Sequence, residues 1–131
     1  MDRKMKEIVK TADAVTKEFV LVYYNNMDNN RDKIGDMFAR DSMYVFDGNR
    51  TTGLASIQKY IFDLPTTSHV ICNINPQPVF GPNDEVSTII VNTAGYVKHD
   101  GKKPKDFTES FVLSYVDDQW KIRSSVVRLL Q

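Results

Sequence analysis

The spacing of apolar residues along this chain changes once, at Pro65. Before that proline, apolar side chains recur every three or four positions, which is typical of helices with one buried face. After it, long apolar-rich segments alternate with short turn sequences, which is typical of strands joined by hairpins. Helices first and hairpin-connected strands afterwards predict one α+β domain over residues 1–131, with an antiparallel sheet.

Three helices are expected before the proline. The first is the longest and carries one apolar stripe, formed by Ile8, Ala12, Val15, Phe19, Val22 and Tyr23. The polar, turn-prone residues 25–30 should end it. A shorter second helix should bury Ile34, Met37 and Phe38. Thr52 is expected to cap the third helix, which runs through Leu64 until Pro65 stops it.

Five strands are expected, of which the first is short. Residues 43–46 form it, and the sequence Asp47-Gly48-Asn49 that follows is typical of a tight turn. The four longer strands are residues 69–80, 86–98, 107–116 and 119–130. Because successive side chains of a strand point to opposite faces of the sheet, each strand contributes to both faces.

The two faces of this sheet differ in character. Phe107, Phe111 and Leu113 share one face, which suits packing beneath the helices. The second face, opposite these aromatic residues, carries fewer charged residues than a face open to solvent would. This second face is therefore predicted to bind a protein partner through Ile90, Asn92, Ala94, Ser110, Val112, Val126 and Arg128.

Charge and composition narrow the class of partner. Lys plus Arg and Asp plus Glu both number 17, so the formal net charge is zero, whereas chains that grip nucleic acid are normally basic. No apolar stretch approaches the length of a membrane span, and no signal peptide is visible. We therefore expect neither nucleic acid nor membrane as a direct partner. Asn49-Arg50-Thr51 matches a glycosylation acceptor, which we interpret as a chance match.

Few residues could carry catalysis or hold a metal. His69 and His99 are the only histidines, and neither has a metal-ligand spacing with Cys72. His99 should lie in a solvated turn, and Cys72, the sole cysteine, should be a small buried hydrophobe in a reducing compartment. No phosphate-binding loop or nucleophile elbow is present. The sequence predicts no cofactor and no metal.

Glu109 is the one residue with an enzymatic interpretation. Among the aromatic residues of the inner face its pKa would rise, and Tyr23 or Tyr24 could supply a hydroxyl beside it. The alternative is that Glu109 reaches solvent at the end of the sheet or pairs with a lysine. We favour this second interpretation because no second carboxylate is placed to share the chemistry, so no catalytic residue is predicted.

Short segments in order along nearly the whole chain, from about Glu18 to Leu129, resemble the nuclear transport factor 2 family. They include Glu18-Phe19-Val20-Leu21-Val22-Tyr23-Tyr24, Phe46-Asp47-Gly48-Asn49, Pro76-Gln77-Pro78-Val79, Gly95-Tyr96-Val97-Lys98, Phe111-Val112-Leu113 and Trp120-Lys121-Ile122. The resemblance implies a cone in which three N-terminal helices pack on a strongly bent antiparallel sheet.

The likeness is nearest to the export-related members of this family. It implies a non-catalytic adaptor, the light subunit of an mRNA export receptor, which pairs with the related domain of a large subunit. Through that complex it would support binding of phenylalanine-glycine nucleoporins and mRNA export, shuttling between nucleus, nuclear pore and cytoplasm. Family arginines at the position of Arg128, eight residues after Trp120, meet an acidic residue of the large subunit. The family usually has Asp where this chain has Ser125.

Two alternatives remain open. A homodimeric family member carries the small GTPase Ran in its GDP form by means of acidic residues in one loop. Here that loop is Lys98-His99-Asp100-Gly101-Lys102-Lys103-Pro104-Lys105, whose charge is reversed, although Asp47 keeps another acidic position. A pocket isomerase or dehydratase of the same fold would place its carboxylate base near Phe46, where this chain has an aromatic ring.

Overall fold

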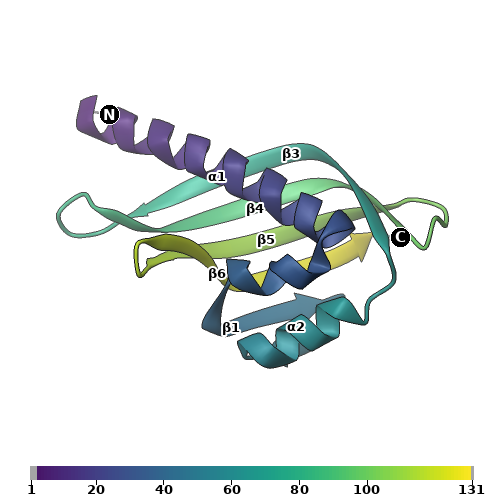
Figure 1. Ribbon diagram of the computed structural model, residues 1–131. Helices are drawn as coiled ribbons and strands as arrows, with labels where there is room; N and C mark the ends of the chain where they lie inside the picture. Colours follow the sequence, from purple (N-terminus) through teal and green to yellow (C-terminus); the bar gives the residue numbers. More distant parts are fainter. Residues whose placement is uncertain (1–2, 131) are drawn as a thin grey trace.

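The computed structural model describes residues 3–130. Three helices and six strands follow one another along the chain (Figure 1). In order they are the helix α1 (Arg3–Asn29), the 3₁₀ helix η1 (Arg31–Met37), β1 (Phe38–Phe46), β2 (Asn49–Thr52), the helix α2 (Leu54–Phe62), β3 (Thr67–Phe80), β4 (Val86–His99), β5 (Lys105–Val116) and β6 (Gln119–Leu130). None of these helices is long and apolar enough to cross a membrane.

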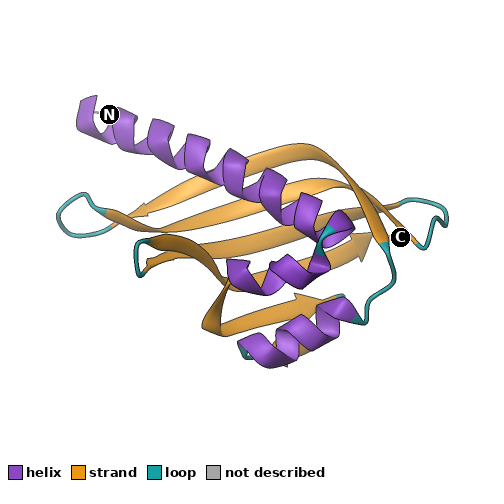
Figure 2. Cartoon of the chain, viewed as in Figure 1, coloured by secondary structure: helices purple, strands orange, loops and turns teal. Residues whose placement is uncertain are grey.

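The six strands form one bent sheet in the order β2-β1-β6-β5-β4-β3. The helices lie on the same side of it (Figure 2), which confirms the α+β architecture predicted above. Antiparallel pairing was predicted throughout, but β1 and β6 run parallel, with Val45 opposite Val126. Parallel strands need a long crossover connection, and the chain between β1 and β6 supplies one. Hairpin signals reveal only pairing between sequence neighbours, so this pair was missed.

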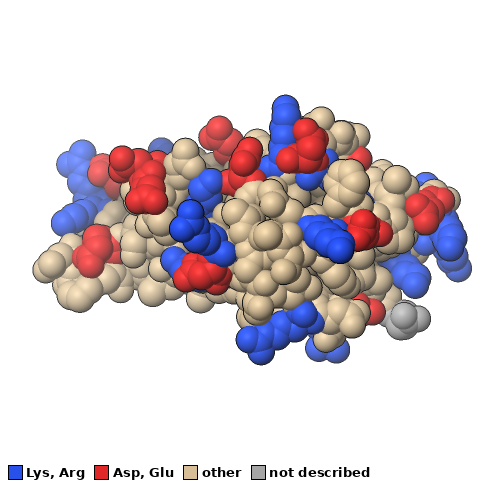
Figure 3. All heavy atoms as spheres, turned by 60° about the horizontal axis from the view of Figure 1, so that its bottom comes forward, with Lys and Arg blue, Asp and Glu red and all other residues tan. Residues whose placement is uncertain are grey.

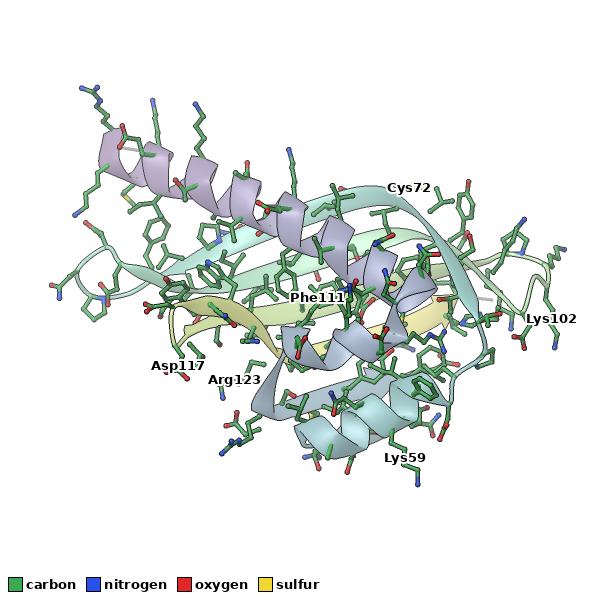
Figure 4. The ribbon with its side chains drawn as sticks, viewed as in Figure 1. Lys59, Cys72, Lys102, Phe111, Asp117 and Arg123 are labelled. Atoms are coloured by element: carbon green, nitrogen blue, oxygen red, sulfur yellow. The ribbon has the colours of Figure 1, made fainter. Side chains whose placement is uncertain are left out.

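The core lies between α1 and the inner face of the sheet. The rings of Tyr23 and Phe111 meet edge to face, with centroids 4.9 Å apart. Phe107, Phe111 and Leu113 are each buried, as predicted for residues beneath the long helix. Figure 4 shows Phe111 beneath α1.

The boundaries of the two shorter helices differ from the predictions. Phe38 has extended backbone angles and begins β1, so the strand starts before residue 43. Thr52 does not cap α2, because it pairs with Met43 in the β1–β2 hairpin. Gly53 occupies the cap position instead, with φ +86, and no side chain bonds to the helix end there. The predicted turn at Asp47-Gly48 therefore joins β1 to the short strand β2, which the sequence pattern did not reveal.

Strand β3 bends over the end of α1 with the help of two features. Its register to β4 shifts between Ile71 and Asn73, which leaves Cys72 at a bulge. Opposite the bulge, a Cβ on Gly95 would come within 2.0 Å of the carbonyl oxygen of Val70, so the strands approach where no side chain fits. Cys72 is exposed on this bend (Figure 4), so its predicted burial is wrong. Cys72 continues the exposed positions Ser68 and Val70, and the bulge leaves Asn73 exposed beside it.

Candidate functional site

The outer face of the sheet is the side without helices, and it brings the seven predicted partner-binding residues together. Their strands β4, β5 and β6 are neighbours in the sheet. In the central row Asn92 lies opposite Ser110, and Ser110 opposite Val126. The rows on either side of it contain Ile90 with Val112, and Ala94 with Thr108 and Arg128. The prediction that these residues share one face is therefore correct in geometry.

Large apolar side chains are exposed on this outer face. Ile90 is 39% exposed and Val126 37%, close to the centre of the face. Three more form a cluster at one end, where Tyr96 lies opposite Val70 on one side and Asp106 on the other, and Asp106 lies opposite Leu130. Val70, Tyr96 and Leu130 are also exposed. Several exposed large apolar side chains on one face favour a protein-binding site.

Among the seven predicted residues, the polar side chains are one hydrogen-bonded pair and one cation. The Ser110 hydroxyl donates to Oδ1 of Asn92 at 2.7 Å, so these two satisfy each other within their row. Arg128 is exposed and makes no ion pair with any residue in the described range 3–130. Its guanidinium stands beside Val126 and Leu130, where a partner's carboxylate could approach it.

Glu109 lies on the opposite, inner face and is fully enclosed. Its carboxylate accepts hydrogen bonds from the hydroxyls of Tyr23 at 2.8 Å, Tyr24 at 2.8 Å and Ser125 at 2.6 Å. The favoured interpretation, in which Glu109 reaches solvent or pairs with a lysine, is therefore wrong. Strand alternation places it between two buried phenylalanines, and three hydroxyl donors from α1 and β6 take the place of water.

The protonation of this buried group follows from its surroundings. Burial raises the pKa of Glu109, and the hydrogen bonds from Ser125, Tyr23 and Tyr24 oppose that rise. Burial, followed by the charge of Glu109, raises the pKa of both tyrosines well above the usual value, so they remain hydroxyl donors. A carboxylate at the position of Ser125 would repel Glu109, and the serine hydroxyl donates to it instead.

Little space is left beside Glu109 for a substrate. The adjoining cavity measures about 20 Å³ and is lined by Met27, Tyr44, His69 and Phe107 among others. That volume holds roughly one water molecule, whereas ligand sites usually measure about 300–1,000 Å³. No group of three His, Cys, Asp or Glu side chains within residues 3–130 could hold a metal ion. The interior network is suited to holding α1 on the sheet.

Both histidines border the same interior region. His69 Nδ1 lies 2.6 Å from Oδ1 of Asp28, which ties β3 to the end of α1. His99 was predicted in a solvated turn but is half-buried, with its ring edge-to-face against Phe46 at 6.2 Å. His99 is the last residue of β4, and its ring contacts Phe46, the last residue of β1. The sequence contained no sign of this contact, because Phe46 and His99 meet only through the bend of the sheet.

Comparison with known proteins agrees with this architecture. The family model described as the nuclear transport factor 2 (NTF2) domain matches residues 15–129 of this sequence. A curated NTF2-related export protein of Caenorhabditis elegans is 34% identical over 115 residues, covering 86% of this chain and 84% of the relative. NTF2-related export protein 1 of Bos taurus is 32% identical over 131 residues, covering 94% and 91%.

Solved structures show the same fold. Nuclear transport factor 2 from Cryptosporidium parvum superimposes with a TM-score of 0.79 at 25% identity, covering 91% of this chain and 94% of that one. A chain of the Candida albicans Mtr2–Mex67 M domain complex gives 0.68 at 13% identity, covering 86% and 92%. A putative scytalone dehydratase gives 0.75 at 19% identity, covering 97% and 87%. On the family match and on both curated relatives, this chain belongs to the nuclear transport factor 2 domain family.

Proposed function

We propose that this protein is the small, non-catalytic subunit of an mRNA export receptor. Its outer sheet face would bind the NTF2-like domain of a large subunit, through Ile90, Asn92, Ala94, Ser110, Val112, Val126 and Arg128. The observation that carries the proposal is a sheet face with exposed apolar residues beside Arg128, which forms no ion pair within residues 3–130, in a chain whose curated relatives are named export proteins.

The size of the face supports a stable dimer. The outer face extends over the four strands β3, β4, β5 and β6. Four strands of about 12 residues at usual spacings cover roughly 19 Å by 40 Å, or about 760 Å². A standard protein interface buries about 800 Å² on each partner. Burial of the apolar side chains would stabilise the complex, and Arg128 would select a partner that offers a carboxylate.

The complex would then support binding of phenylalanine-glycine nucleoporins and passage of mRNA through the nuclear pore. We therefore expect the protein to shuttle between the nucleus, the pore and the cytoplasm. Two relatives are named NTF2-related export proteins, which supports a role in export. A solved complex of Mtr2 with the Mex67 M domain has the same fold and contains two different chains, which makes a heterodimer a natural assembly for the fold.

Two other functions receive less support. A homodimeric carrier of Ran-GDP would need acids where this chain has Lys98, Lys102, Lys103 and Lys105. An isomerase or dehydratase would need a substrate cavity, and the space at Glu109 measures about 20 Å³. The likeness to a putative scytalone dehydratase extends to the fold alone.

Val126→Glu tests the proposal. Affinity purification of the wild-type chain from cell extract, followed by mass spectrometry, should recover a large export subunit with an NTF2-like domain. Val126→Glu should recover none, because it buries an unpaired carboxylate at a cost of several kcal/mol. Leu21→Glu is the matched control, since Leu21 is 62% exposed on α1. Equal recovery by all three proteins would show that the outer face is not the interface.

A further inference from the structure

A lysine-rich depression at one end of the sheet is unused by the proposed heterodimer. It measures about 250 Å³ and combines two kinds of side chain. Phe46, Pro65 and Leu129 are apolar, whereas Lys102, Lys103 and Lys105 are cationic. The lysines come from the turn between β4 and β5 and from the start of β5. Basic side chains predominate at this end of the molecule in Figure 3, and Lys102 extends from the same turn in Figure 4.

Within the described residues 3–130, these lysines pair with no carboxylate. Asp47 accepts the backbone N–H of Leu129 at 3.3 Å. Asp106 follows Lys105 directly, and strand alternation turns it to the other face, opposite Leu130. The positive charge of the turn is therefore left for another molecule.

The turn itself is held in one conformation. Asp100 Oδ1 accepts hydrogen bonds from the backbone N–H and the hydroxyl of Thr66, both at 3.1 Å. Its own N–H donates to the carbonyl of Thr66 at 2.8 Å, and Lys102 N–H donates to the carbonyl of His99 at 3.0 Å. Gly101 has φ +68, which a residue with a side chain rarely adopts. A fixed turn holds its cations in place before binding, which lowers the entropy lost on association.

Positive groups outnumber Asp100 around His99, which lies beside the turn. Burial, followed by the charges of His69, Lys105 and Arg31, lowers the pKa of His99, and the charge of Asp100 opposes that shift. The guanidinium of Arg31 donates to backbone carbonyls, including that of Ile61 at 3.1 Å, and the charges of Asp28 and Asp100 act on it from a distance. Positive charge around a partly apolar hollow favours a ligand that brings both negative charge and an apolar side chain.

From this charge complementarity we propose that the lysine-rich depression is a docking site for an acidic protein segment with an apolar residue among its carboxylates. The carboxylates pair with Lys102, Lys103 and Lys105, and the apolar side chain packs on Phe46, Pro65 and Leu129. The site lies at the end of the sheet and is separate from the seven residues of the proposed heterodimer face, so both partners can bind at once.

Fluorescence anisotropy with a labelled peptide tests this site on the full chain. The probe is Ser-Glu-Glu-Ser-Glu-Leu-Glu-Ser-Glu-Glu-Ser. We expect saturable binding that weakens several-fold between about 50 and about 200 mM salt. Replacing every Glu of the probe by Gln should abolish binding. Replacing its Leu by Ser should weaken binding about fivefold, the loss expected for partial burial of one side chain. Equal binding of the Glu and Gln probes would overturn the proposal.

Matched charge reversals locate the site. Lys102→Glu/Lys103→Glu/Lys105→Glu should weaken binding at least about tenfold. The control is Lys6→Glu/Lys10→Glu/Lys17→Glu, which makes the same change in net charge on exposed positions of α1. Equal losses in the two triple variants would overturn the proposal, because they would reflect net charge alone. Tighter binding of inorganic polyphosphate or of phosphatidylserine vesicles than of the peptide would also overturn it. The variant Lys102→Glu/Lys103→Glu/Lys105→Glu should still recover the large subunit in the affinity purification. The peptide result and the heterodimer proposal can therefore succeed or fail independently.

Discussion

At the scale of single residues, Arg128 is the side chain on which partner choice should depend most. It has no ion pair within residues 3–130 and stands on an otherwise neutral row with Ala94 and Thr108. Arg128→Ala should weaken the heterodimer by about 2–5 kcal/mol, mainly through faster dissociation, since a buried charge pair would be broken. Arg128→Lys should restore only part of the loss, because an ammonium cannot form the planar two-bond pair.

Dissociation rates measured by surface plasmon resonance at two salt concentrations check this prediction. The Ala variant should dissociate fastest and the Lys variant at an intermediate rate. Identical rates for wild type, Ala and Lys would show that Arg128 lies at the rim of the interface, where a charge contributes little.

Glu109 predicts a dependence of stability on pH. Its pKa is raised in the folded protein, above all by burial. Because the unfolded chain then releases its proton first, the contribution of Glu109 to stability is complete below the unfolded pKa of about 4.3. It is lost as pH rises through the folded pKa. Glu109→Gln removes the titration, so the stability of wild type relative to this variant should fall as pH rises from about 4.3.

Urea unfolding of both proteins between about pH 4 and 8 measures this difference. Relative stability that instead increases with pH would mean that the three hydroxyl donors outweigh burial and lower the pKa of Glu109. Glu109→Leu is a useful second variant, since it leaves the buried hydroxyls of Tyr23 and Ser125 without this acceptor, whereas Tyr24 keeps its hydrogen bond to Thr93. We expect it to cost about 2–4 kcal/mol.

At the scale of elements, the close approach of β3 to β4 beside the bulge depends on Gly95. A Cβ there would lie within 2.0 Å of the Val70 carbonyl oxygen, a backbone atom that cannot move away easily. Gly95→Val should therefore destabilise the fold by about 2–3 kcal/mol or more, measured by thermal unfolding. Ala94→Val is the matched control, because the neighbouring position faces outward and accepts a β-branched residue. Similar losses in both variants would contradict a role for the close approach.

The elements also show what could be predicted from sequence. Alternation placed Phe107, Phe111 and Leu113 inside and Val126 and Arg128 outside, because a strand permits only two directions. Features that depend on contacts distant in sequence were missed. The parallel β1–β6 pair and the bulge at Cys72 belong to this class, as neither leaves a local pattern.

At the scale of the whole molecule, the candidate face was predictable while the interior was not. Seven outer residues follow from strand alternation alone, and the structure shows them in adjacent rows. The network at Glu109 needs α1, β5 and β6 to meet. The sequence offered Tyr23 or Tyr24 as a hydroxyl beside Glu109, but it did not reveal that both tyrosines and Ser125 donate to this one carboxylate.

The last prediction concerns the whole surface that a Ran-type partner would meet. The turn between β4 and β5 carries lysines that no carboxylate within residues 3–130 pairs with, so an interface that needs acids there meets repulsion. Asp47 alone cannot compensate, since it brings one negative charge against Lys98, Lys102, Lys103 and Lys105. Titration calorimetry with Ran in its GDP form at physiological salt should therefore detect no binding, while a homodimeric nuclear transport factor 2 serves as positive control. Micromolar binding would instead favour the homodimeric carrier, and the isolated chain would then have to form a stable dimer despite two mirrored Arg128 side chains without an acid between them.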